Sequence, residues 1–169
     1  MLSAIKKRRS HRAYLDKPIE EEKMKEILLA AMSSPSGHNR NPWEFIIVKN
    51  EEMKSALSRA SNYATFAKQA PAIIVLSAQE DSMWIEDTAI VASHIYLEAT
   101  NQRLGTCWIQ IHGMETPDGN DSETYVKELL GIPNTQKVLC IMPIGYESDK
   151  LPEHDETKFV EEKIHEERW

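Results

Sequence analysis

The sequence contains only six glycines among its 169 residues, and none of them belongs to a glycine-rich nucleotide-binding motif. Neither G-x-G-x-x-G nor the P-loop pattern occurs, so a Rossmann site that holds a dinucleotide permanently is not expected. The G-x-S-x-G elbow of serine hydrolases and the H-E-x-x-H helix of zinc proteases are absent as well. These absences remove the commonest nucleotide-binding and hydrolytic chemistries.

Cysteines and long apolar runs are also scarce. Cys107 and Cys140 each lie in an apolar, strand-like context, so we expect buried free thiols and neither a disulfide nor a zinc site. No apolar run approaches the roughly 20 residues that span a bilayer. The first residues, MLSAIKKRRSHR, lack the hydrophobic segment of a secretory signal. We therefore expect a cytoplasmic protein without membrane contact and without a metal ion.

The charge of the chain is −7, and it is unevenly distributed. Residues 1–17 carry six basic side chains against the single acid Asp16, a net +5, so the remainder carries −12. An acidic protein is a poor general nucleic-acid binder. The local basic cluster instead suggests a small anionic ligand.

Segments with helical periodicity alternate with apolar, β-branched runs, which indicates an α/β or α+β class. In the segment 82–103, Ile85, Ala89, Ala92, Tyr96 and Ala99 are spaced as one buried face, and Gly105 is the expected C-terminal cap. The residues from 147 onward are highly charged and have no core pattern, so we expect one domain, 1–169, with a C-terminal arm, 147–169. The expected helices are 3–9, 20–32, 51–60, 82–103 and 122–130, and the expected strands are 44–49, 72–78, 106–111 and 137–146.

The strongest candidate site is the run Arg8-Arg9-Ser10-His11-Arg12. Guanidinium groups and a hydroxyl group offer a phosphate dianion both charge and directed donors. In extended chain, Arg8, Ser10 and Arg12 face the same side and can line one ligand. From charge alone, a solvated basic patch or a targeting signal explains the run equally well.

Three further segments are candidates, although each is weak when taken alone. The turn-rich loop Ser34–Trp43 contains Asn39 and Asn41, whose amides suit a heterocycle with imide and carbonyl groups; a plain connector is the alternative. Leu104-Gly105-Thr106-Cys107-Trp108-Ile109 and Pro143-Ile144-Gly145-Tyr146 follow a long helix and an apolar strand respectively. In the first, Gly105 allows an unusual backbone angle, and Thr106 and Trp108 face one side if the segment is extended; the second is a turn that can expose backbone groups to a ligand.

Taken together and in this order, the four motifs resemble those of the nitroreductase family of flavoproteins. The resemblance runs from R-R-S-x-R through P-S-x-x-N-x-x-P-W and L-G-T-C-W-I to P-I-G-Y, and so covers nearly the whole chain. It implies an α+β fold with a central, mostly antiparallel sheet flanked by helices. It also implies an intertwined homodimer with flavin mononucleotide (FMN) at the interface.

The resemblance also assigns roles to individual residues. Arg8 and Ser10 would hold the phosphate and ribityl end, and Arg12 would lie nearer the pyrimidine side of the ring. Asn39 and Asn41 would come from the partner subunit, and Lys158 would reach the phosphate. Asn41 departs from the family pattern, which usually has Gln there, and Arg40 adds a charge. The expected cofactor-binding residues are Arg8, Arg9, Ser10, Arg12, Pro35, Ser36, Asn39, Asn41, Thr106, Trp108, Pro143, Ile144, Gly145 and Lys158.

The implied activity needs no catalytic side chain, because the flavin N5 carries the chemistry. Electrons from NADH or NADPH, bound transiently, would pass by a ping-pong mechanism to a small acceptor such as a nitroaromatic or a quinone. The alternatives are a flavin storage, delivery or sensing protein without significant turnover, and a relative of the dehalogenases.

Overall fold

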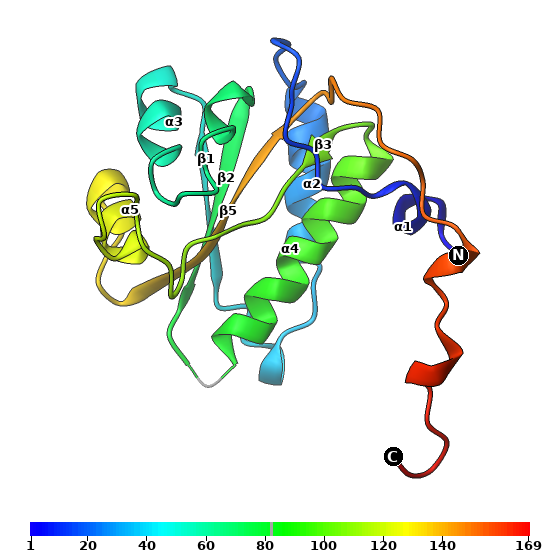
Figure 1. Ribbon diagram of the computed structural model, residues 1–169. Helices are drawn as coiled ribbons and strands as arrows, with labels where there is room; N and C mark the ends of the chain where they lie inside the picture. Colours follow the sequence, from blue (N-terminus) through cyan, green and yellow to red (C-terminus); the bar gives the residue numbers. More distant parts are fainter. Residues whose placement is uncertain (82) are drawn as a thin grey trace.

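The computed structural model describes residues 1–81 and 83–169 of the chain and shows a three-layer α+β arrangement. Helices α2 (Glu21–Met32) and α4 (Trp84–Asn101) cover one face of the sheet, and α3 (Glu51–Leu57) and α5 (Ser122–Leu130) cover the other (Figure 1). The short helix α1 (Ser3–Lys7) precedes the run Arg8–Arg12. Helices α1 and α3 are shorter than the expected 3–9 and 51–60.

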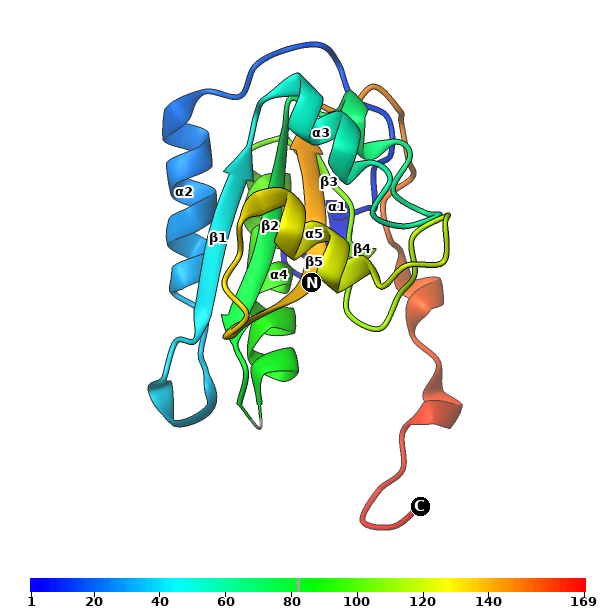
Figure 2. The same cartoon turned by 90° about the vertical axis from the view of Figure 1, so that its left-hand side faces the viewer.

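The sheet is antiparallel at every strand pair, which confirms the expected topology. Its order is β1-β2-β5-β3, and β4 pairs with β5 as well. The central pair β2 and β5 is seen between the helical layers in Figure 2. The strands are β1 (Trp43–Val48), β2 (Ala72–Gln79), β3 (Gly105–Thr106), β4 (Ile109–Gln110) and β5 (Gln136–Gly145).

Strand β2 is buried on both faces, which explains the unbroken apolar run Ala72–Leu76 within it. Ile74 and Leu76 pack into the core formed with α2 and α4. Ile73 and Val75 belong to the separate core formed with α3 and α5. Alternate side chains of a strand point to opposite faces, so one strand serves both cores. Each such aliphatic side chain stabilises the fold by about 1.5–3 kcal/mol.

The buried face of α4 agrees only in part with the expected one. Ala92 and Ala99 are buried as expected, but Ile85 is 43% exposed, and the buried face also includes Asp87 and Thr88. Asp87 accepts a hydrogen bond from the backbone N–H of Gly37 (2.8 Å), and Thr88 donates to the carbonyl oxygen of Trp84 (2.6 Å). These two buried positions are occupied by polar side chains, so the spacing of apolar residues does not identify them.

The end of α4 also differs from the expectation. Gly105 is not its cap, because the helix ends at Asn101 and Arg103 adopts the left-handed conformation with φ 61°. Gly105 lies instead in β3. Helix α5, by contrast, ends at Leu130 as expected, and Gly131 is its left-handed cap with φ 67°.

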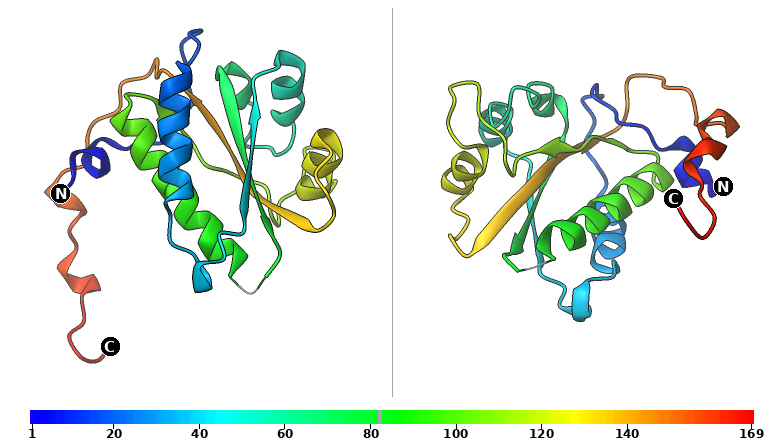
Figure 3. Two further views of the ribbon diagram at one scale, coloured as in Figure 1. Left: turned by 180° about the vertical axis from the view of Figure 1, so that it is seen from behind. Right: turned by 60° about the horizontal axis from the view of Figure 1, so that its bottom comes forward.

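The C-terminal segment begins on the body of the protein and then leaves it (Figure 3). Ser148 N–H donates to the carbonyl oxygen of Ala13 (3.1 Å), and His154 N–H donates to that of Lys6 (2.8 Å). Residues 147–154 therefore follow the N-terminal segment of the same chain. The remainder, with the 3₁₀ turns η3 (Glu156–Lys158) and η4 (Glu161–Lys163), projects away from the layers. The arm thus begins later than residue 147.

Candidate functional site

The run Arg8–Arg12, called the basic segment below, is held in an extended conformation against the edge of the sheet. Ser10 forms a parallel bridge with Thr106, and the backbone N–H of His11 donates to the carbonyl oxygen of Thr106 (3.1 Å). The segment therefore extends the sheet beyond β3. Because this backbone is extended, Arg8, Ser10 and Arg12 alternate with Arg9 and His11.

His11 anchors this segment to the chain that follows β5. Its ring is buried, and its Nδ1 lies 2.6 Å from Asp149 Oδ1 while its Nε2 lies 3.2 Å from Glu147 Oε2. The ring packs directly on Gly105, where an added Cβ would lie 2.8 Å from His11 Cβ. A glycine at residue 105 is thus required for the close approach of the basic segment to β3.

The three arginines of the cluster do not form an ion pair with any carboxylate that the structure describes. The Arg8 guanidinium lies over the Tyr96 ring, 5.1 Å from its centroid, and 3.4 Å from His154 Nε2. Arg9 donates to the carbonyl oxygen of Pro152. Arg12 lies 5.9 Å from the centroid of Phe66. This donor set retains charge and hydrogen-bonding capacity for an anion, so it fits a phosphate ester.

Tyr96 joins the basic segment to the residues after β3. Its hydroxyl group lies 3.3 Å from Ser10 Oγ and accepts a hydrogen bond from the backbone N–H of Trp108 (2.5 Å). Burial raises the pKa of the Tyr96 phenol, so the hydroxyl group stays protonated. Tyr96 therefore positions Ser10 without adding a negative charge beside the arginines.

The predicted lining residues around Thr106 lie beside the basic segment, but several of them are occupied within the chain. Thr106 is buried and donates its hydroxyl hydrogen to the carbonyl oxygen of Pro143 (2.8 Å). Ile144 is fully buried in the core. Gly145 permits the close approach of Pro71, whose Cδ would lie 2.4 Å from an added Cβ. Trp108 is partly buried, and its Nε1 donates to Gln110 Oε1 (2.9 Å).

A hollow of about 440 Å³ lies next to Arg12. Phe66, Cys107 and Trp108 contribute to its walls. Burial raises the pKa of the Cys107 thiol, which keeps it neutral. A positively charged group beside mostly apolar walls suits a flat aromatic ring that carries a partial negative charge on one edge.

The loop with Asn39 and Asn41 lies at the opposite end of the sheet. Trp43, two residues after Asn41, pairs with Ala78, whereas Ala72 pairs with Ile144. The six steps from Ala72 to Ala78 correspond to about 20 Å along a strand. One chain therefore does not bring the two asparagines to the basic segment.

This loop has an unusual backbone. His38, Asn39 and Asn41 are exposed and have φ values of 54°, 55° and 50°, in the left-handed region. Ser36 fixes the turn, since its hydroxyl group donates to Asn41 Oδ1 (3.0 Å) and accepts from Asn41 N–H (2.9 Å). Pro35 precedes it and is exposed. Lys158 is also exposed and lies in the 3₁₀ turn η3 of the C-terminal segment.

The model of the nitroreductase family matches residues 5–62 and 55–146 of the chain. The chain belongs to the nitroreductase family. A nitroreductase-family protein of Archaeoglobus fulgidus, provisionally named NADH dehydrogenase/NAD(P)H nitroreductase, is 32% identical over 175 residues, covering 99% of this chain and 98% of that protein. A protein of Thermus thermophilus named NADH dehydrogenase is 38% identical, covering 90% of this chain and 89% of that one.

A solved nitroreductase structure shows the same architecture. The FMN-dependent nitroreductase of Clostridium difficile R20291 superimposes with a TM-score of 0.96 at 36% identity, covering all of both chains. Among the described residues, no helix is both long enough and apolar enough to cross a membrane.

Two site residues of this nitroreductase-family chain have no distinct signal in the sequence. The sequence places Tyr96 only on a helix face and His11 only within a basic run. Their partners lie far along the chain: Tyr96 meets Ser10, and His11 meets Asp149. The buried aromatic hydroxyl in α4 was the one available signal, because such a group needs a hydrogen-bond partner.

Proposed function

We propose that the protein is an FMN-dependent oxidoreductase that takes electrons from NADH or NADPH and passes them to a small acceptor such as a nitroaromatic or a quinone. The observation that carries this proposal is the arginine-rich segment, held in extended form at the sheet edge beside the hollow near Arg12. The names of the Clostridium difficile structure and of the Archaeoglobus protein support it. When bound, FMN supplies the two-electron chemistry.

Arg8 and Ser10 hold the phosphate and ribityl end in this proposal. Arg8 stays in place because it stacks on Tyr96, and Ser10 because its hydroxyl group lies beside that of Tyr96. Arg9 adds charge at the same end. Arg12, beside the hollow, stabilises negative charge on the pyrimidine side of the ring.

The residues after β3 and at the end of β5 form the floor of the site. The hydroxyl group of Thr106 and the carbonyl oxygen of Pro143 are hydrogen-bonded to each other, and the side chain of Ile144 is buried in the core. These residues therefore act through their backbone or their packing. Gly145 keeps the surface close to Pro71. Trp108 contributes to the wall of the hollow. We expect the nicotinamide and the acceptor to exchange at this one site, which gives ping-pong kinetics.

The complete site requires a homodimer. Asn39 and Asn41 lie at the far end of the sheet, so they serve the site of a partner subunit, and Lys158 on the tail reaches the phosphate. Pro35 and Ser36 shape the loop that presents the asparagines. Residues 1–169 then form one domain whose arm, within 147–169, extends over the partner. The exposed apolar side chains of Phe159, at 69%, and Ile164, at 56%, support this contact.

A mixing experiment tests this shared site. Arg8→Ala and Asn41→Ala are purified separately as weakly active dimers, then unfolded and refolded together. In a mixed dimer, one site carries both changes and the other carries neither. Random mixing gives half mixed dimers, so about a quarter of all sites are intact and activity rises to about a quarter of wild type. If activity stays at the level of the separate variants, the two residues serve the same site of one chain and the shared site is wrong.

Cofactor identity is tested independently. Heat-released flavin from the purified protein should co-elute with FMN, since the basic segment supplies donors for a terminal monophosphate. Recovery of FAD alone would overturn the assignment.

A further inference from the structure

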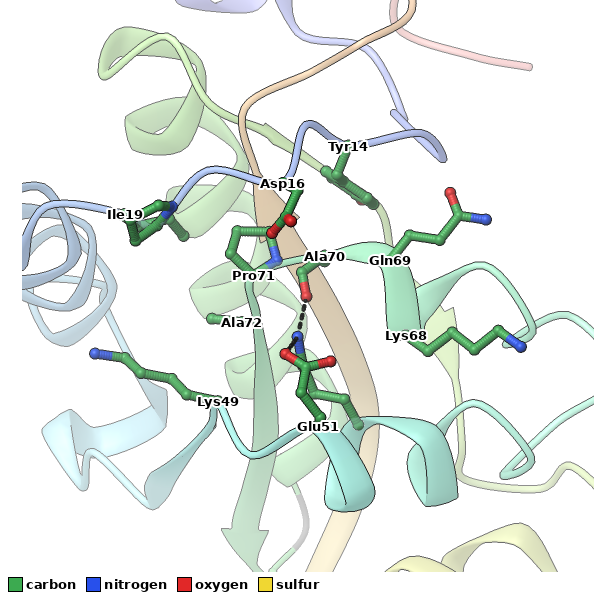
Figure 4. A pocket seen from close by; sticks show the side chains of 12 residues that line it. Tyr14, Asp16, Ile19, Lys49, Glu51, Lys68, Gln69, Ala70, Pro71 and Ala72 are labelled. Atoms are coloured by element: carbon green, nitrogen blue, oxygen red, sulfur yellow. Dashed lines mark hydrogen bonds and ion pairs between the residues drawn. The ribbon is translucent and has the colours of Figure 1, made fainter.

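A second cavity lies outside the proposed flavin site and has a separate set of walls. Its volume is about 700 Å³, within the range of small-molecule sites. It lies where the linker before α2, the start of α3 and the start of β2 meet (Figure 4). It shares no lining residue with the hollow beside Arg12. We call it the Lys54 cavity.

The base of the cavity holds a buried ammonium group. Lys54 is 3% exposed, and its Nζ donates to the carbonyl oxygen of Ala70 (2.8 Å) and pairs with Glu51 Oε1 (2.7 Å). A buried lysine needs a compensating negative charge. Since an ammonium group has three donors, these two contacts leave one hydrogen for a further acceptor.

The compensating carboxylate is poorly held. The side chain of Glu51 is 81% exposed, and Figure 4 shows it at the mouth of the cavity, facing Ala70. An exposed ion pair is worth little, because water solvates the carboxylate almost as well as the ammonium does. Another carboxylate can therefore replace Glu51 at small cost.

The remaining walls favour an anion with an apolar body. Ile19, Pro71 and Ala72 line the cavity next to the buried ammonium, and burial of apolar ligand surface against them is favourable. Lys49 and Lys68 flank the opening on opposite sides. With Lys54 they outnumber Glu51 and Asp16 among the lining residues, so the cavity carries one excess positive charge.

We propose that the Lys54 cavity binds a small organic monocarboxylate, whose carboxylate replaces that of Glu51 on Lys54 and whose apolar body packs against Ile19 and Pro71. This site is independent of the proposed redox function. It gives the protein a second place where a metabolite-sized anion is recognised.

Titration with benzoate tests the proposal, using the full-length protein with excess FMN present throughout so that the flavin site is filled. Binding is followed by calorimetry and by the amide NMR signals of Lys54, Ala70 and Ala72. Benzamide, which has the same shape without the charge, is the control probe. We expect saturable binding of benzoate, shifts at these three amides, and at least about tenfold weaker binding of benzamide.

Two variants that each remove one negative charge distinguish binding in the cavity from a general electrostatic attraction of benzoate. Glu51→Gln removes the competing carboxylate and should tighten benzoate binding roughly two- to fivefold. Glu52→Gln, an exposed neighbour that does not line the cavity, should leave the affinity at the wild-type value. Lys54→Met should weaken binding at least about tenfold.

Two results would overturn the proposal, and neither requires that Lys54→Met folds. Equal affinities in Glu51→Gln and Glu52→Gln would show that Glu51 does not compete with the ligand. Shifts at Cys107 and Trp108 instead of at Lys54 and Ala70 would place benzoate in the hollow beside Arg12.

Discussion

Replacement of Arg8 by alanine should weaken FMN binding far more than riboflavin binding. Arg8 has no carboxylate partner among the described residues and contacts only the Tyr96 ring and His154. Its removal therefore breaks no internal ion pair, and the loss falls on the ligand. A charge-assisted hydrogen bond contributes about 1.5–3 kcal/mol. This corresponds to roughly ten- to hundredfold weaker FMN binding.

The assay is quenching of flavin fluorescence on titration into the apoprotein, with both ligands and at fixed ionic strength. Riboflavin lacks the phosphate, so wild type and Arg8→Ala should bind it almost equally. Arg8→Lys should recover part of the FMN affinity, since it restores the charge without the guanidinium fork. Equal losses for FMN and riboflavin in Arg8→Ala would refute the phosphate contact.

Three other changes test the site and the core that supports it. Arg12→Ala should lower the midpoint potential of bound FMN, because the reduced form carries the negative charge that Arg12 stabilises; an unchanged potential in a redox titration would remove Arg12 from the ring. His11→Gln should lower the free energy of unfolding by about 1–3 kcal/mol and also weaken FMN binding, whereas His165→Gln in the exposed tail should change neither. Burial raises the pKa of the Cys140 thiol, so above about pH 9 the unfolded chain loses a proton that the folded chain keeps. Stability in urea should therefore fall as the pH rises through this value, and the fall should be smaller in Cys140→Ala.

The sheet and most helices could be predicted because their signals are local. The run Ala72–Leu76 is apolar without interruption since both faces of β2 are covered. Helix α5 ends at Leu130 as expected, because the left-handed cap at Gly131 is a property of a few neighbouring residues. Strand β5 was found in the same way, from an apolar run bounded by turn residues.

Features that depend on contacts between distant segments could not be predicted. Apolar spacing predicts a core position for Ile85, because the burial of Asp87 and Thr88 depends on partners that no periodicity reveals. The local sequence predicts a helix cap at Gly105, whereas this glycine allows His11 of the N-terminal segment to approach β3. The motif containing Arg8, Ser10 and Arg12 was visible, but Tyr96, which positions it, is 86 residues from Ser10.

The most direct test of the proposed function is an anaerobic spectral titration of the protein reconstituted with FMN. We expect a yellow protein whose flavin absorption bleaches on addition of NADH or NADPH. The absorption should return when a quinone or a nitroaromatic compound is added. A protein that binds FMN but stays yellow with both nicotinamides would contradict the oxidoreductase assignment and favour flavin storage or sensing. A protein that does not bind FMN at all would contradict the site itself.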